Sequence, residues 1–292
     1  MNSEQLPLDF RTIKFERIQI SDLKPNENGK GLSGKIQYLN DKGIPENFFI
    51  QSPLMQFPYG VSDYLGEHTN FSLSASLEEK VPIVHEFVKF LKKFDEFTLQ
   101  YALKHAKVIL GKNAEVLRED GTKGPITLAG IRMFHNSLIK EPKEEKKDSY
   151  SSTFSTKVYP MKTKDDQIIP DTYNFECFEF DGVTRTSTNI PHHSTGCMHY
   201  QPASLYAVNG KFGITNVLKK VVLTSKGGNV QIKYVPNMYG EQPPPPPVDI
   251  YDDAVEKAVQ EAEKKRERDP SPEPEEVESQ PAKPAKKSKS KK

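Results

Sequence analysis

The sequence predicts a mainly β domain, a partly open antiparallel barrel or sandwich with inserted helices, followed by a disordered tail. Three observations predict this order. Stretches in which every second residue is apolar occur both before residue 80 and after residue 150, and this is the period of a strand. Between them, apolar residues recur at the spacing of a helix. After residue 240, a polyproline run opens a segment of charged and small residues that is too polar to build a core.

Four stretches before residue 80 predict strands. Residues 12–20 alternate between apolar and polar with one slip, which is typical of a strand with a bulge. Residues 35–39 and 48–51 predict short strands. Residues 69–77 alternate without a slip, so one face of this strand is expected to carry Phe71, Leu73, Ala75 and Leu77.

Apolar residues at helical spacing predict two helices in the middle of the chain. The first begins at Pro82, a residue that suits the first turn of a helix, and runs to about residue 94. The second covers about residues 97–110 and ends at Gly111, because glycine tolerates the left-handed conformation that commonly ends a helix.

Strand character returns after a charged loop, at residues 154–159 and 173–180. The strongest turn signal in the chain is Asn209-Gly210, which lies between two apolar stretches. Both residues readily adopt positive φ angles, so this pair predicts a two-residue hairpin turn of type I′.

A second hairpin signal is Gly227-Gly228, between apolar stretches at 219–224 and 230–235. Together the two turns predict an antiparallel meander. Gly213 lies inside the strand that follows the first turn, which indicates a bulge or a close approach of another group to the backbone.

The chain divides into three predicted parts. Residues 1–240 form the folded domain and hold all 16 Phe and 11 of the 12 Tyr. Residues 241–248 are a polyproline linker, which is stiff. Residues 249–292 are a disordered tail, acidic over 249–278 and basic over 279–292. Of the 41 basic and 40 acidic residues, 30 and 28 precede residue 249, so the domain is near neutral and its basic surface must be a patch.

The sequence carries no signature of catalysis. Its glycines form neither a phosphate loop nor a dinucleotide fingerprint, and no nucleophile elbow occurs, so no enzyme is expected. Two cysteines are too few for a disulfide scaffold, and neither a signal peptide nor an apolar run of about 20 residues is found. We expect a protein that is neither secreted nor bound to a membrane.

Thiol and imidazole groups gather in one stretch, PHHSTGCMH at 191–199. These are ligand types that zinc prefers, and the candidates are Cys177, His192, His193, Cys197 and His199. The spacing departs from common zinc motifs because no Cys-x-x-Cys pair occurs. The alternative is a polar loop with a buried cysteine, and on balance neither a metal nor another cofactor is expected.

Basic residues alternate with aromatic residues in several predicted strands and loops. Proteins that bind single strands of nucleic acid combine a cationic groove with rings that stack on bases. The candidate binding residues are Lys35, Tyr38, Arg132, Lys157, Tyr159, Lys162, Lys164, Lys211 and Phe212. A charged strand edge that prevents aggregation has the same pattern, and Phe212 taken alone fits a core position better.

Two segments carry a resemblance to a known family. They are FFIQSPLMQFPYGVSDY at 48–64, followed by the alternating strand FSLSASL, and CMHYQPASLYAVNGKFGITNVLKKVVL at 197–223. Together they resemble the single-stranded DNA-binding proteins of large nucleocytoplasmic DNA viruses. That family is similar in turn to the podophage replication type. The resemblance covers about residues 10–236.

The resemblance implies an OB-fold-like, partly open barrel with inserted helices. It implies sequence-independent binding and protection of single-stranded DNA during viral replication, recombination and repair, in the host nucleus or at a cytoplasmic replication site. It also implies replication proteins as partners of the tail and a homodimer as one form of the protein. The tail departs from the phage type, because its acidic stretch is internal and its end is rich in lysine.

The alternative function is that of a non-enzymatic structural or scaffolding protein of a virion. In that case the basic end of the tail would contact DNA or partners, and the β domain would serve as a protein contact. Removal of residues 241–292 separates the two hypotheses, because only the scaffolding protein then loses all binding to nucleic acid.

Overall fold

The computed structural model describes residues 6–26, 29–63, 71–117, 121–147 and 149–225. They belong to the first of the chain's two units, Met1–Pro245. The predicted hairpin at Gly227-Gly228, the linker and the tail lie outside the described residues. The domain boundaries drawn from the sequence therefore stay a prediction. No helix in the described part of the chain is long and apolar enough to cross a membrane.

Two long antiparallel strands, β18 (Ser194–Val208) and β19 (Lys211–Ser225), form the centre of the sheet. The turn between them is the predicted Asn209-Gly210 pair, with φ angles of 52° and 70°. The stretches expected as separate strands at 211–218 and 219–224 are one continuous strand. A register shift between His199 and Tyr200, which pair with Lys220 and Leu218, leaves Lys219 without a partner in β18.

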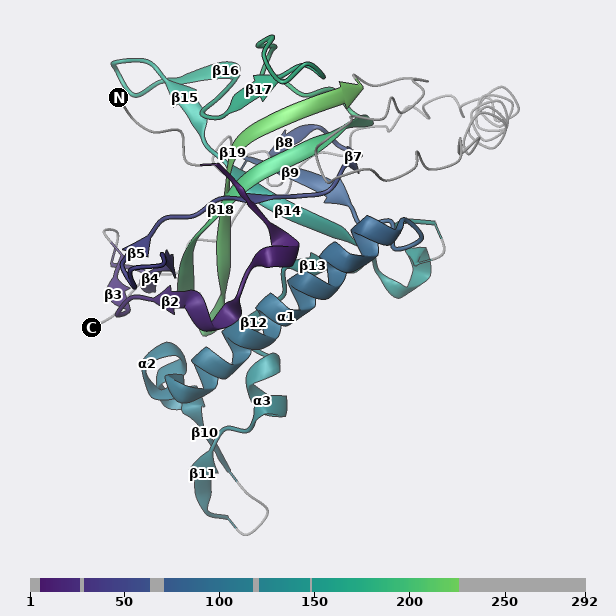
Figure 1. The fold of residues 1–292 in the computed structure, drawn as a ribbon. Coiled ribbons are helices and arrows are strands. Elements are labelled where there is room, and N and C mark those ends of the chain that lie inside the picture. The colour runs from purple at the N-terminus through teal and green to yellow at the C-terminus, as the bar shows by residue number, and fades with distance from the viewer. Residues whose placement is uncertain (1–5, 27–28, 64–70, 118–120, 148, 226–292) are drawn as a thin grey trace, which may run out of the picture. The chain divides into compact units, whose positions relative to one another are not determined.

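Shorter strands pair along both outer edges of this hairpin (Figure 1). Along β18 lie β4 (Leu32–Leu39), β6 (Ile50–Gln51) and β7 (Met55–Phe57). Along β19 lie β12 (His135–Asn136), β14 (Thr153–Val158) and β17 (Glu176–Phe178), all three parallel to it.

The sheet curves back on itself. β14 pairs with β9 (Phe71–Ser76), and β9 pairs with β8 (Val61–Asp63). Each strand in the order β7, β18, β19, β14, β9 and β8 pairs with the next. The last strand, β8, is joined to the first, β7, by a tight turn of the chain at Gly60, and not by β-sheet hydrogen bonds. This is the predicted OB-fold-like, partly open barrel, with helices inserted between β9 and β14.

The remaining short elements extend or flank the barrel. They are β1 (Leu8–Asp9), β2 (Ile18–Ile20), β3 (Lys24–Pro25), β5 (Pro45–Glu46), β13 (Ile139–Lys140), β10 (Glu115–Leu117), β11 (Lys123–Pro125), β15 (Pro160–Lys162), β16 (Ile168–Tyr173) and the 3₁₀ turns Phe10–Thr12, Phe15–Arg17, Gly111–Ala114 and Glu144–Lys146. The strand predicted at 12–20 is wrong over most of its length. Only Ile18–Ile20 pairs as a strand, because Phe15 leaves the period of two and packs against Phe90 of helix α1 (Pro82–Lys104).

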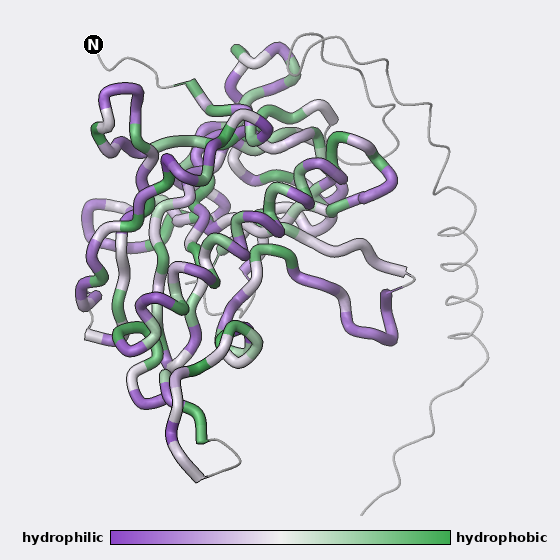
Figure 2. Tube along the Cα trace, turned by 60° about the horizontal axis from the view of Figure 1, so that its bottom comes forward, coloured by the Kyte–Doolittle hydropathy of each residue, from purple (hydrophilic) through white to green (hydrophobic). Residues whose placement is uncertain are grey.

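Helix α1 runs without a break from Pro82 to Lys104, and α2 (Ala106–Leu110) follows it. The predicted gap near residue 95 is wrong, because no proline or glycine interrupts the turn there. The predicted end at Gly111 is correct, and its φ is 55°. A third short helix, α3, spans Leu128–Arg132. Hydrophobic and hydrophilic positions alternate along the turns of α1 (Figure 2).

The core lies between the inner face of the barrel and α1. Phe87 of α1 contacts Phe10, Phe154 of β14 and Tyr200 of β18, with ring centroids 5.2, 5.6 and 6.5 Å apart. Such aromatic pairs each contribute about 0.5–1.5 kcal/mol beyond the area that they bury. The predicted apolar face of the strand at 69–77 is confirmed, since all four of its residues are buried.

Candidate nucleic-acid interface

The side of the sheet that faces away from α1 carries a row of side chains across five strands, polar on four of them and apolar at Val217 of β19. On β14, Phe154, Thr156 and Val158 are buried, so Lys157 points to the opposite side. Lys157 is in register with Ser72 of β9 and Val217 of β19, and the row continues to Ser62 of β8 and Gln201 of β18. We call this side of the sheet the outer face.

Most other side chains on the outer face are small and carry hydroxyl groups. The hydroxyl oxygens of Ser74 and Ser155 lie 2.8 Å apart across β9 and β14. Ser204 of β18 is in register with Thr215 of β19 and Lys35 of β4. Because these side chains are short, a bound strand of nucleic acid can approach the sheet closely, and the hydroxyls can donate to phosphate oxygens.

Lys157 and Tyr159 form the pair that best fits contact with nucleic acid. The Lys157 Nζ lies 5.1 Å from the centroid of the Tyr159 ring, and the ring is 43% exposed. A cation beside an accessible ring combines a phosphate contact with a surface for stacking a base. Both residues were predicted from the sequence, as was Lys35, which is exposed on the same outer face.

A second cluster of cations lies at the β17 edge of the outer face and was missed by the sequence reasoning. Lys220 Nζ of β19 lies 4.3 Å from the centroid of the Phe178 ring, and Arg185 Cζ lies 5.6 Å from it. The Arg185 guanidinium also forms an ion pair with Glu176, at 2.5 Å. In the sequence, the Lys219-Lys220 doublet within an otherwise apolar strand could have marked Lys220 as a candidate binding residue. No local signal marks Arg185, which the loop after β17 brings to the ring.

Tyr206 is a further aromatic residue on the outer face that the sequence reasoning missed. Its hydroxyl accepts a hydrogen bond from Nδ2 of Asn136, at 2.8 Å. It lies over Gly213, where an added Cβ would come within 2.9 Å of the Tyr206 hydroxyl. The close approach predicted at Gly213 is therefore confirmed. Tyr206 could have been found from the sequence, because the Asn209-Gly210 turn places it directly opposite Gly213 in the hairpin.

Tyr38 does not lie on the outer face. Its ring packs against Phe48 at 5.3 Å, and the Arg17 guanidinium lies 4.9 Å from its centroid. Its hydroxyl accepts from the backbone N–H of Lys14 at 3.2 Å. Tyr38 instead lines a pocket of about 360 Å³ at the β2–β4–β5 end of the molecule. Its ring is half-buried and lines this pocket at another part of the molecule, so it is not placed to stack on a base at the outer face.

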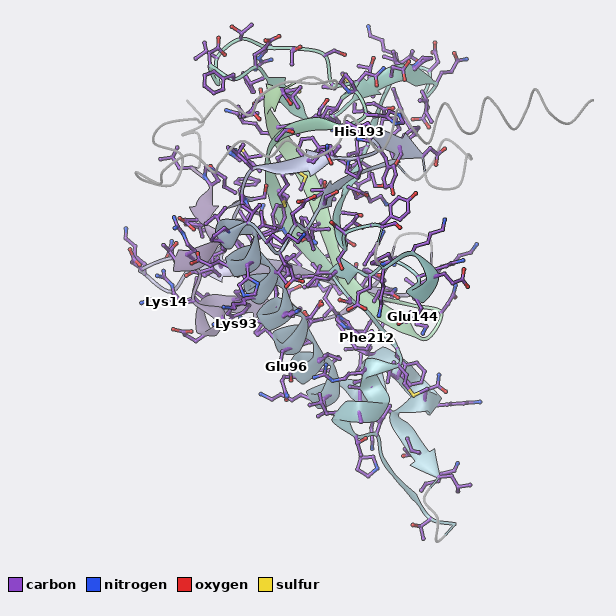
Figure 3. The ribbon with its side chains drawn as sticks, turned by 90° about the vertical axis from the view of Figure 1, so that its right-hand side faces the viewer. Lys14, Lys93, Glu96, Glu144, His193 and Phe212 are labelled. Carbon is purple, nitrogen blue, oxygen red and sulfur yellow. The ribbon has the colours of Figure 1, made fainter. Side chains whose placement is uncertain are left out.

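Phe212 is fully buried, so its assignment as a nucleic-acid contact is wrong and its alternative assignment to the core is correct. It packs against His135 at 5.2 Å. In Figure 3 it lies at one end of the long strands, and His193 lies toward the other. The adjacent Lys211 is held by a hydrogen bond from Nζ to the carbonyl of Met133, at 2.7 Å.

The three other predicted basic residues lie outside the five-strand row. Arg132 of α3 forms an ion pair with Glu96 of α1 at 2.6 Å. Lys162 pairs with Asp166 at 2.9 Å within the β15–β16 hairpin, and Lys164 is exposed in the turn of that hairpin. This hairpin follows directly after Tyr159, but Asp165 and Asp166 stand in the same turn as the two lysines, so the turn carries no net positive charge.

The candidate zinc ligands do not converge. Cys177 packs in the main core, in register with Val221, whereas Cys197 packs with Phe178 and Val222. Since neighbouring residues of a strand point to opposite faces, the two thiols lie on opposite sides of the sheet. Within the described residues, no group of three His, Cys, Asp or Glu side chains is arranged to hold a metal ion.

Two titratable groups of this region are neutral at physiological pH. Burial raises the pKa of the Cys197 thiol to about 12. Burial, together with the charge of Lys220, lowers the pKa of His199 to about 4. The positive charge of the outer face therefore comes from its lysines and from Arg185, and not from histidine.

Comparison of the sequence with protein-family models and with curated proteins finds no match. Among solved structures, the chain is similar to a single-stranded DNA-binding protein of bacteriophage T7, gp2.5, with a TM-score of 0.39 and 16% identity over 62% of this chain and 93% of that chain. It is also similar to the single-stranded DNA-binding protein of bacteriophage Enc34, with a TM-score of 0.35 and 12% identity over 70% and 90%. A further similar structure is the Enc34 protein in complex with single-stranded DNA, with a TM-score of 0.33 and 12% identity over 71% and 97%.

These are proteins of phages, and the link to large nucleocytoplasmic DNA viruses stays a prediction. The likeness is distant in both sequence and backbone. What this chain binds therefore has to be argued from its own residues.

Proposed function

We propose that this chain is a non-enzymatic protein that binds single-stranded DNA along the outer face of its barrel, without sequence preference. The observation that carries the proposal is the Lys157–Tyr159 pair. It places an exposed cation 5.1 Å from an accessible ring, on a face that is otherwise lined by short hydroxyl side chains. Lysine and hydroxyl groups contact phosphates, which are the same at every position of a strand.

The geometry favours single strands over duplex. A base must leave its stack before it can lie against Tyr159, and only a single strand presents bases in this way without the cost of unpairing. The face is also a broad part of the sheet surface and not a projecting helix or ribbon of the kind that enters the major groove of a duplex.

The cations mark a path across the outer face. Lys35 lies at the β4 side, Lys157 in the middle, and Lys220 at the β17 edge. We also propose Lys164, which is exposed in the turn of the β15–β16 hairpin, as a contact beyond β14. We assign the other basic residues to structural contacts, because Glu96 holds Arg132, Asp166 holds Lys162, Glu176 holds Arg185 and the carbonyl of Met133 holds Lys211.

The biological role that we propose is protection of single strands during viral DNA replication, recombination and repair. This part of the proposal is supported by the resemblance of residues 48–64 and 197–223 to viral single-stranded DNA-binding proteins. The same resemblance supports replication proteins as partners of the charged tail, a homodimer, and a site of action in the host nucleus or at a cytoplasmic replication site.

The test is a titration of fluorescent oligo-dT and of a duplex of equal length at several salt concentrations. We expect tighter binding of the single strand, weakening steeply with salt as counterion release requires. Lys157→Ala with Tyr159→Ala should weaken binding, with a stacked ring contributing about 1–3 kcal/mol. Lys92→Ala, an exposed lysine on α1, is the matched control and should leave binding unchanged. Equal affinity for duplex and single strand would contradict the proposal.

Removal of residues 241–292 separates this function from that of a scaffolding protein. If the outer face binds DNA, the shortened chain should retain its affinity for oligo-dT. Complete loss of binding would instead assign nucleic-acid contact to the basic tail.

A further inference from the structure

A small substructure projects from the far end of α1, away from the barrel strands (Figure 1). It consists of the last turn of α1, helix α2 and the hairpin β10–β11, and we call it the knob (residues 103–117 and 121–126). The β10–β11 pair is a two-stranded sheet of its own and does not join the main sheet. The knob is therefore attached to the domain mainly through α1, α2 and the buried Ile126.

A groove of about 650 Å³ lies in the knob between α2 and the hairpin. Of the residues that the structure describes, Lys104, Lys107 and Lys123 line it together with one acid, Glu115. The rest of its wall is largely apolar and includes Val108 and Ile126. The described part of the chain supplies no carboxylate within 4 Å of any of these three lysines.

The surface beside the groove is apolar and open. Val108 is 54% exposed, Val116 is 47% exposed and Leu117 is 68% exposed. All three residues of β10 are exposed, and a lone two-stranded hairpin is at best marginally stable in water. Contact with another chain would cover these side chains and stabilise the hairpin.

We propose that the knob groove binds an acidic segment of a partner protein, one that carries apolar side chains between its carboxylates. The lysines match the charge of such a segment. Val108 lines the groove, and Leu117 shares the strand face of Glu115 and Lys123, so these two side chains match its apolar residues. Within the described residues, β10 and β11 pair with each other and with no other strand, so their outer edges offer backbone groups to a segment that binds in extended form.

The chemistry of the groove favours a peptide over nucleic acid. Among the described residues that line it, His105 has the only ring of aromatic character, and that imidazole is stacked on Tyr101 with centroids 4.3 Å apart. A base would find no open ring there, whereas an apolar side chain would find apolar walls. This site is separate from the outer face, so it does not depend on the proposed binding of DNA.

The test uses the full chain and a fluorescein-labelled peptide of alternating glutamate and leucine. Two control peptides replace either the glutamates with lysine or the leucines with serine. We expect the acidic apolar peptide to bind at least about tenfold more tightly than either control. Lys104→Glu with Lys107→Glu should weaken binding by a further factor of about ten or more. Lys92→Glu with Lys93→Glu, on the same helix but outside the groove, should change it less than twofold.

A crosslinking experiment locates the peptide even if the charge variants fold poorly. A benzophenone amino acid at Val108, which lines the groove, should crosslink to the labelled peptide, and one at Tyr159 should not. Crosslinking at Tyr159 alone, or equal binding of all three peptides, would overturn the proposal. It would also be overturned if oligo-dT displaced the peptide from Val108 and the Lys104/Lys107 variant lost its affinity for oligo-dT, because the groove would then belong to nucleic acid.

Discussion

Asp95 of helix α1 lies 3.4 Å from Nε2 of His135, the first residue of β12, and both side chains are largely buried. The Asp95 carboxylate also accepts from the Ser137 hydroxyl at 2.6 Å and from the Leu138 backbone N–H at 3.1 Å. This contact ties α1 to the segment that pairs with the turn end of β19. It is the main polar link between the helix and the sheet at this end of the barrel.

Burial shifts the pKa values of Asp95 and His135 in opposite directions. Desolvation raises the pKa of Asp95 to about 6, against the lowering effects of Ser137, Leu138 and the Arg132 charge. Desolvation and the Arg132 charge lower the pKa of His135 to about 4. Between pH 4 and 6, Asp95 therefore contributes stability that is lost as the pH rises, whereas the contribution of His135 is lost as the pH falls.

Asp95→Asn removes one of these opposed contributions. Because the carboxyl of Asp95 stabilises the fold most when it is protonated, the variant should lose most stability near pH 4. At pH 7, the loss of unfolding free energy relative to the parent protein should be smaller than at pH 4 by on the order of 2–3 kcal/mol. Urea unfolding of both proteins at pH 4, 5, 6 and 7 measures this difference. A difference in unfolding free energy that is constant across the range would contradict the assignment.

The sequence predicted those parts of the fold and site that depend on neighbours along the chain. The Asn209-Gly210 turn, the end of α2 at Gly111 and the alternating strand at Phe71 are of this kind. The contact between Lys157 and Tyr159 also follows from the sequence, because residues two apart in extended backbone lie on the same face, whereas their role in binding stays a prediction.

The parts that could not be predicted depend on contacts between distant segments. Tyr38 alternates in β4 like any strand tyrosine, and only the packing of Arg17 and Phe48 against it shows that its ring lies away from the outer face. Lys220 and Arg185 meet at Phe178 because β17 pairs with β19 in parallel, which no local pattern encodes. The pattern along a strand indicates which side chains share a face, whereas the pairing of the strands decides which residues lie beside them.

Lys220→Ala tests whether the cluster at the β17 edge contacts DNA. If Lys220 meets a phosphate, its loss should reduce the slope of log affinity against log salt by about 0.7 for a single strand. The Phe178 ring loses one of its two cations, but the core beneath it is untouched, so the melting temperature should stay close to that of the parent protein. Lys89→Ala on α1 provides the control, and an unchanged slope for Lys220→Ala would remove this cluster from the interface.

Neither cysteine should react with thiol reagents in the folded protein. Cys177 is 2% exposed and Cys197 is fully buried, and burial raises the pKa of Cys197 to about 12. The thiolate that attacks such reagents is therefore scarce as well as inaccessible. Titration with Ellman's reagent should report no fast thiol before denaturation and both thiols, the full count of the chain, after it. Fast reaction of either cysteine in the native state would show that its strand opens readily.

Gly60 is required for the turn that closes the barrel between β7 and β8. Its φ is 58°, and an added Cβ would lie 2.2 Å from the backbone carbonyl oxygen of Ile190. Gly60→Ala therefore combines left-handed backbone strain with a clash that the flanking strands cannot relieve. Gly43 isolates the first effect, because its φ is 73° and an added Cβ would meet nothing within 4 Å.

Gly43→Ala should cost about 1–2 kcal/mol of unfolding free energy, which is the strain of the left-handed conformation alone. Gly60→Ala should cost about 1–3 kcal/mol more than that, as overpacking of a tight site does. Urea unfolding of the two variants measures both values. If the two substitutions cost the same, the contact between Gly60 and Ile190 would not hold β7 and β8 in place. The barrel would then have to be kept closed by the β7–β18 and β8–β9 ladders alone.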